Sequence, residues 1–189
     1  MSHFVVVVDN AVAARIMERV LGDPRVRVEN AEERSGAMES ATRILFYDTT
    51  PTVLLLDSDS LEERAITEEQ LEIGGYLRGG SGGHPNRLVL AIPQVEAVLF
   101  SDRAGLENAL GKKIEDDDFF EARFRPKAVF QRLLGKKNPR ERALAVIDRI
   151  DETSLRRMAA HPVIREIRDF IDAVERGKQT RSAKVRRAS

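Results

Sequence analysis

The chain has 189 residues, of which 42% are hydrophobic and 33% are charged, so it is long enough for one globular domain with a buried core. Its 31 Lys and Arg residues balance 31 Asp and Glu residues, so no overall charge attracts it to nucleic acid. The absence of cysteine excludes disulfides and thiolate metal sites, and no apolar run approaches a membrane span; we therefore expect a cytoplasmic protein.

Strands and helices alternate through the first part of the chain. Val5 to Val8 and Val53 to Leu56 are continuous apolar runs, which are typical of parallel strands buried on both faces. Two more strands are predicted at 25–29 and 87–92. Helical spacing of apolar residues predicts helices at 11–21, 35–47, 94–100 and 104–110. This order predicts right-handed crossovers and a mainly parallel sheet, and therefore an α/β fold.

The chain is helical in pattern from Pro126 onward. The expected helices cover 126–134, 139–150, 152–160 and 162–175. From Arg176 to the end there are six Lys or Arg residues and no acid, which is typical of a disordered basic tail. We therefore expect an α/β core over 1–112, a helical extension packed on that core over 113–176, and the tail over 177–189.

The stretch from Gly74 to His84 contains six of the 12 glycines of the chain. It does not end in the Gly-Lys-Ser/Thr of a phosphate-binding P-loop, and no helical pattern begins there. Its composition predicts a mobile surface loop near the sheet edge that carries the acids, either a linker or a lid.

Acidic residues follow the two most apolar strands. Asp9 ends the first run, and Asp57-Ser58-Asp59 ends the second. Because parallel strands end at the same edge of a sheet, we expect these carboxylates to converge there. Mg²⁺ prefers oxygen ligands and usually binds one or two carboxylates together with a phosphate. Glu96 and Asp102, after the next strand, could hold a second ion for a two-metal displacement at a phosphodiester.

Each acidic residue also has a structural interpretation. Asp9 could cap a helix, and Asp57-Ser58-Asp59-Ser60 is a good turn and N-cap sequence. Glu96 and Asp102 could be solvated helix residues, and the acidic run 115–118 a solvated loop. For the aromatic residues of the helical part we expect a place in the core rather than a stacking platform for nucleic acid; they are Phe119, Phe120, Phe124 and Phe130.

The arrangement of these acids resembles the TOPRIM fold shared by topoisomerases, bacterial primases and OLD-type nucleases. Asp9 and Asp57-x-Asp59 follow the strands where that fold carries its acids. The resemblance extends to small single-domain TOPRIM-like proteins related to the OLD nucleases, and covers about residues 3 to 175. The segments that carry it are Ile92 to Asp102, Gly105 to Gly111, Arg125-Pro126-Lys127, Lys136-Lys137 and His161-Pro162.

The resemblance implies a Rossmann-like TOPRIM domain with a C-terminal helical portion and a nuclease activity on DNA or RNA. It implies catalytic roles for Asp9, Asp57, Asp59 and Glu96, which together with Asp102 would bind Mg²⁺ or Mn²⁺. OLD-type nucleases carry an ATPase in the same chain. Because this chain has no Walker motif, a separate ATPase partner protein is implied.

Two departures from the family pattern leave other functions open. Asp9 replaces the usual Glu, and Val98 replaces an aromatic residue after Glu96, which is compatible with a non-catalytic TOPRIM-like subunit. Asp9 and Asp57 also resemble the acids of a phospho-accepting receiver domain of two-component signalling, although Asn10 replaces one of the usual paired acids. The sequence leaves a homo-oligomer open as well.

Overall fold

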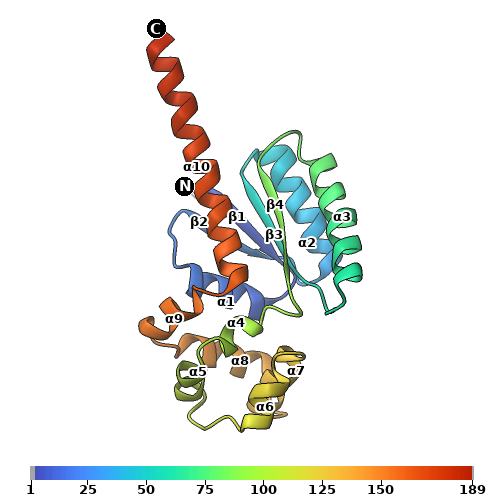
Figure 1. Cartoon of the computed structure of the whole chain (residues 1–189), viewed down its shortest axis with the longest axis vertical. Coiled ribbons are helices and arrows are strands. Elements are labelled where there is room, and N and C mark those ends of the chain that lie inside the picture. The colour runs from blue at the N-terminus through green and yellow to red at the C-terminus, as the bar shows by residue number, and fades with distance from the viewer. Residues whose placement is uncertain (1–2, 189) are drawn as a thin grey trace.

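The computed structural model describes residues 3–188, with side chains up to residue 177, and its centre is a four-stranded parallel sheet (Figure 1). The strands are β1 (Phe4–Val8), β2 (Val26–Asn30), β3 (Thr52–Asp57) and β4 (Asn86–Ala91). Their order is β2-β1-β3-β4, and all three neighbouring pairs are parallel. The predicted α/β fold with a parallel sheet and a C-terminal helical region is confirmed.

The two central strands are the two apolar runs of the sequence. Every residue of β1 and β3 is buried, because each of these strands is covered on both faces and has a neighbour on each side. The register pairs Val8 with Leu55. Asp9 therefore follows β1 at nearly the same level as Asp57, the last residue of β3.

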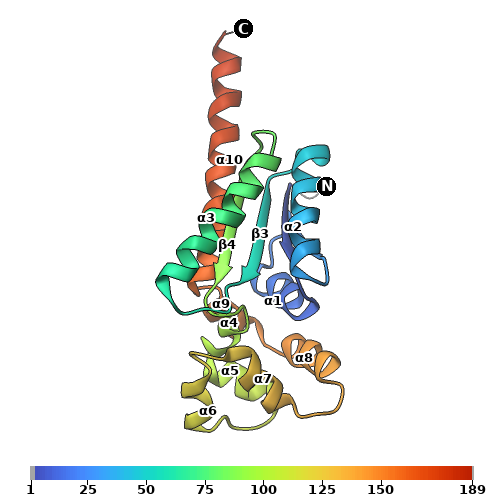
Figure 2. The ribbon, with the colours of Figure 1, turned by 90° about the vertical axis from the view of Figure 1, so that its right-hand side faces the viewer.

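Helices cover both faces of the sheet (Figures 1 and 2). On one face, Val5, Val7 and Leu54 pack against the second and third helices of the chain. On the other face, Val6, Leu55 and others pack against the first and last helices. The elements of the first face are α2 (Arg34–Arg43), the π-helix η1 (Ile44–Asp48) and α3 (Glu63–Gly80); those of the second are α1 (Ala11–Leu21) and α10 (Pro162–Ala188).

The remaining helices lie beyond the carboxyl ends of the strands (Figure 2). They are α4 (Ala97–Phe100), α5 (Arg103–Leu110), α6 (Asp116–Glu121), α7 (Pro126–Leu134), α8 (Pro139–Asp148) and α9 (Glu152–Met158). Their buried side chains belong to the same hydrophobic core as the second face of the sheet. The helical region thus covers the sheet edge at which the acidic residues are found.

The glycine-rich stretch is not the mobile loop that the sequence predicted. Its first half forms the last turns of α3, and only the residues after Gly80 form a turn. A Cβ atom at Gly80 would lie 2.4 Å from Cγ2 of Thr42, so glycine lets α3 approach α2 closely. Because α3 returns from the end of β3 to the start of β4, this turn lies at the edge opposite to the acids, which excludes a lid over them.

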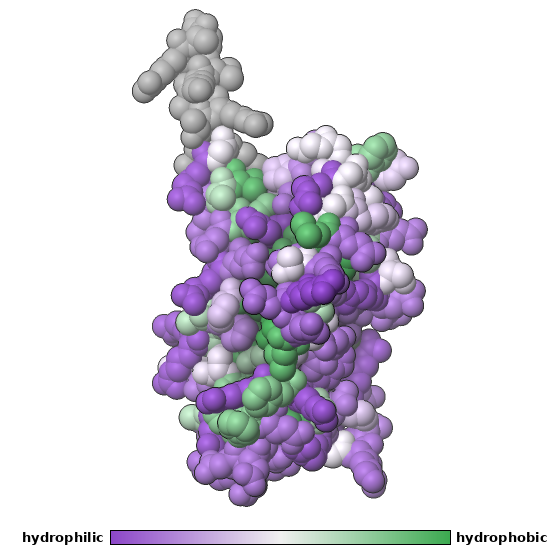
Figure 3. Space-filling view, turned by 45° about the vertical axis from the view of Figure 1, so that its right-hand side comes forward, coloured by the Kyte–Doolittle hydropathy of each residue, from purple (hydrophilic) through white to green (hydrophobic). Residues whose placement is uncertain are grey.

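Two parts of the helical region differ from the sequence pattern. Helix α10 extends to Ala188, over most of the stretch 177–189 for which the sequence predicts a basic tail; Lys, Arg, Gln and Ala favour helix. Phe130 is buried as expected, but the exposed fractions of Phe120 and Phe124 are 59% and 50%; Phe120 lies on α6, which is short and has no fully buried residue, and Phe124 lies in the turn that follows it. Figure 3 shows hydrophobic side chains at the surface over this region.

No helix between residues 3 and 188 combines the length and the apolar composition that crossing a membrane requires.

Candidate functional site

Asp57 is the centre of the polar groups at the carboxyl edge of the sheet. Its side chain is almost fully buried, although it is a carboxylate. Oδ1 accepts a hydrogen bond of 2.8 Å from the backbone N–H of Val95, and Oδ2 lies 3.7 Å from Nζ of Lys127. The loop after β4 and the helix α7 therefore both hold this carboxylate in place.

Asp59 and Asp9 lie at the same edge, with different partners. Asp59 is exposed and has a φ of 55°, in the left-handed region, so the chain turns sharply after β3. Its Oδ1 accepts a hydrogen bond of 2.7 Å from Nε2 of Gln94. Asp9 accepts one of 2.8 Å from Nδ2 of Asn10. Since the Oδ1 of Asn10 accepts from the N–H of Ala13, it is Asn10 and not Asp9 that caps α1.

Glu96 is the most deeply buried acid of the group. It directly precedes α4, is 2% exposed, and its Oε2 has no hydrogen-bond partner among the described residues. Burial, followed by the charge of Asp57, raises the pKa of Glu96 to about 7. Burial also raises the pKa of Asp57 to about 6, against the effect of the Val95 N–H, with Asp9 adding to the rise. The charge of Lys127 lowers both pKa values, but by less than burial raises them.

The predicted carboxylates do not by themselves form a complete site for the expected Mg²⁺. Between residues 3 and 188, no three His, Asp or Glu side chains lie close enough together to hold a metal ion. Asp9, Asp57 and Asp59 thus share an edge without forming a ready three-carboxylate site. Mg²⁺ usually keeps several waters and needs only one or two protein carboxylates. Asp57 and Glu96 fit that smaller requirement, since Glu96 has a buried oxygen without a partner.

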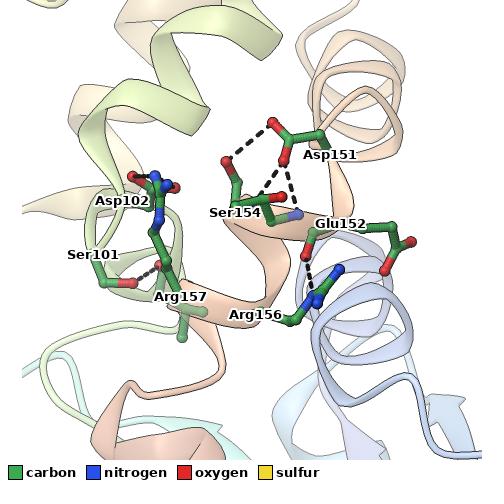
Figure 4. Close-up of polar contacts among 9 residues, drawn as sticks. Ser101, Asp102, Asp151, Glu152, Ser154, Arg156 and Arg157 are labelled. Carbon is green, nitrogen blue, oxygen red and sulfur yellow. Dashed lines mark hydrogen bonds and ion pairs between the residues drawn. The ribbon is translucent and has the colours of Figure 1, made fainter.

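Asp102 belongs to a different part of the molecule (Figure 4). Both of its carboxylate oxygens lie 3.4 Å from Nη1 of Arg157, which comes from α9. It is not among the main charges that shift the pKa of Asp57 or Glu96. Beside it, Asp151 caps α9 by accepting from the N–H groups of Thr153 and Ser154. The structure therefore gives Asp102 a partner at the α5–α9 junction and does not bring it to the predicted metal site.

Sequence reasoning missed the cation and the amide of this site. Lys127 was noted only as part of a motif, and Gln94 was not assigned a role. Gln94 joins the two sides of the site, because its Nε2 donates to Asp59 and its Oε1 accepts from the backbone N–H of Lys127. Pro126 predicts the start of helix α7, and so places Lys127 in the first turn of a helix. Nothing local in the sequence, however, indicates that this turn lies beside the end of β3.

Comparison of the chain with protein-family models, with curated proteins and with solved structures finds no match. The α/β fold with strand order 2-1-3-4 is therefore what is shown, and the TOPRIM resemblance stays a prediction.

The stability of the metal-free protein should depend on the charge of Glu96. Its folded-state pKa of about 7 lies above the ordinary value of 4.5, so its contribution to stability is present at low pH and is lost as pH rises through 7. The substitution Glu96→Gln removes this loss. The free energy of unfolding of the variant relative to the natural protein should therefore rise by roughly 2 kcal/mol between pH 5 and pH 8.

Urea unfolding in EDTA at the two pH values measures this change. Burial lowers the pKa of His161, which acts in the opposite direction in the same range, but His161 is present in both proteins and cancels in the comparison. If the free energy of unfolding changed equally with pH in the two proteins, the pKa of Glu96 would not be raised by folding.

Proposed function

We propose that the protein is a Mg²⁺-dependent phosphodiesterase of the TOPRIM type that acts on nucleic acid. The observation that supports this most is the pair of buried carboxyls, Asp57 and Glu96, with raised pKa values at the carboxyl edge of the sheet. Perturbed pKa values of this kind cluster at functional sites because purely structural acids are usually given a partner. Among the described residues, the ammonium group of Lys127 lies 3.7 Å from the Asp57 carboxylate, and Arg34 donates to the backbone oxygen of Asp57.

The residues of the site suit phosphoryl chemistry. Asp57 and Glu96 would hold the ion, which when bound would neutralise charge that develops on a phosphodiester. Lys127 is half-buried and lies on the helical side of the site, where its ammonium group would bind a non-bridging phosphate oxygen. Asp59 and Gln94 would keep α7 and the sheet edge together through their hydrogen bonds.

The positions of the acids support the TOPRIM assignment within this proposal. Asp9 after β1 and Asp57-x-Asp59 after β3 follow neighbouring strands, and Glu96 follows β4, the next strand in the sheet. If the TOPRIM assignment is right, we also propose a separate ATPase partner protein, because OLD-type nucleases carry an ATPase and this chain has no Walker motif. A non-catalytic subunit of such a complex is the reading to adopt if the site proves inert.

A receiver-like function has one observation in its favour, the approach of Lys127 to Asp57. A phospho-accepting Asp beside a Lys is the arrangement that this alternative requires. Against it, Lys127 comes from a helix rather than a strand end, and Asp57 is only 5% exposed. We therefore place this function second.

Incubation of the purified full-length chain with single-stranded DNA, duplex DNA and RNA tests the proposal. We expect cleavage of at least one of them with Mg²⁺ or Mn²⁺ and none in EDTA, read on a denaturing gel. Incubation with acetyl phosphate, followed by mass measurement, tests the second function. Phosphorylation of Asp57 without any cleavage would favour the receiver, and neither reaction would favour the non-catalytic subunit.

A further inference from the structure

A cavity of about 260 Å³ lies next to Glu96 and Lys127. It is enclosed by the start of α1, the end of β2, and the helices α7 and α8. The apolar part of its lining consists of Ala11, Val12, Phe130, Leu134, Pro139 and Ala143. An apolar cavity that opens onto a candidate catalytic site is the usual form of a substrate pocket.

Several polar groups line the cavity, of which Lys127 also approaches Asp57 and Asn30 accepts at Oδ1 from the backbone N–H of Glu32. Glu96 contributes its buried Oε2, which has no partner among the described residues. Arg140, at the start of α8, is exposed and has no ion-pair partner in the part of the chain that the structure describes. Asn30 and Gln131 add amide groups to the rim. The cavity thus combines two cations, Lys127 and Arg140, and two acids, Glu32 and Glu96, with apolar side chains and hydrogen-bonding amides.

This combination matches one nucleotide unit better than other small ligands. A nucleobase has two apolar faces and a polar edge, and it is attached to a phosphate that needs cations. The volume is slightly below the roughly 300–1,000 Å³ of ligand pockets in general, so it has room for a single nucleotide and not for a base pair. Glu96 and Lys127 line the cavity and also belong to the metal site, so a phosphate bound there would lie beside Asp57.

We propose that this cavity binds one unpaired nucleotide, with its base between the apolar walls and its phosphate near Lys127 and Arg140. The proposal rests on the proposed function and deepens it, because it makes the substrate a single-stranded end or an unpaired nucleotide. Base pairs would have to open before a nucleotide could enter the cavity.

Calorimetric titration of the full-length chain with AMP in EDTA tests binding separately from cleavage. Adenosine and ribose 5-phosphate, which lack the phosphate or the base, should each bind at least about tenfold more weakly than AMP. Arg140→Ala should weaken AMP binding about tenfold, and Val12→Trp, which fills the cavity, should abolish it. Arg142→Ala is the matched control, because Arg142 is exposed on the same helix but does not line this cavity; its affinity should be unchanged.

Competition against a fluorescent AMP analogue tests whether the cavity takes an unpaired nucleotide of a nucleic-acid strand. A single-stranded oligonucleotide should displace the analogue, and a blunt-ended duplex of equal length, which has no loop, should not. Absence of AMP binding, or equal AMP binding by the natural protein, Arg140→Ala and Val12→Trp, would overturn the proposal even if Mg²⁺-dependent cleavage is found. Conversely, the natural protein could bind AMP, lose affinity on Arg140→Ala and still cleave no nucleic acid. That result would support the nucleotide-binding cavity and contradict the proposed nuclease activity.

Discussion

Replacing Asp57 by Asn should reduce metal-dependent cleavage of nucleic acid about a thousandfold and leave the protein folded. The amide side chain has nearly the same shape, and its oxygen can still accept the hydrogen bond from the Val95 N–H. It removes the negative charge, however, and with it half of the carboxylate pair that would hold the ion. Cleavage rates with Mg²⁺ and with Mn²⁺, together with thermal unfolding, measure both parts of this prediction.

Asp102→Asn is the matched control for this experiment. Asp102 is buried to a similar degree, at 7% exposed against 5% for Asp57, but its partner is Arg157. Its substitution should lower stability through that contact and change the cleavage rate only a few-fold. Equal loss of activity in both variants would mean that the charge of Asp57 has no special role, and full activity of Asp57→Asn would contradict the metal-site proposal.

Gly105→Ala should lower the free energy of unfolding by about 2–3 kcal/mol, which is a large effect for one added methyl group. A Cβ atom at Gly105 would lie 2.2 Å from Oγ and 2.5 Å from Cβ of Ser154, and 2.8 Å from Oδ2 of Asp102. Ser154 is buried and its Oγ bonds to the capping residue Asp151, so it cannot move away freely (Figure 4). Urea unfolding followed by circular dichroism gives the size of the effect.

Gly75→Ala is the control at an uncrowded glycine, which also lies within a helix. Gly75 lies in α3, and a Cβ atom there would meet no atom within 4 Å. Because Ala favours helix over Gly, this variant should gain about 0.5–1 kcal/mol. If both variants change stability in the same direction, the crowding at Gly105 is not what determines the result.

The features of the fold that could be predicted are those with a local cause. The helix at 126–134 was predicted with its observed bounds, since Pro126 can begin a helix and Gly135 follows its last residue. The glycine-rich stretch was predicted wrongly because its first half continues helix α3, and the contact of Gly80 with Thr42 of α2 is one that no local pattern contains. Likewise, apolar character alone could not show that Phe120 lies on a short outer helix and is exposed.

In the candidate site, too, some features could be predicted from the sequence and others depend on tertiary packing. Asp9 and Asp57 could be placed at one edge because parallel strands end together, and that rule needs only the sequence. The burial of Glu96 and its unpartnered oxygen depend on how the helical region covers the edge. Lys127 and Arg157 determine which acids are paired, and each reaches its acid across a long sequence separation that spacing cannot reveal.

Because α10 covers part of one face of the sheet, that part stays uncovered during synthesis until α10 has been made. Ile164, Ile167 and Phe170 of this last helix share the core with Val89 and Ala91 of β4. A ribosome adds roughly 5–20 residues per second, so β4 exists for several seconds before its cover is made. During that time the newborn chain must keep an apolar face of its sheet away from other chains.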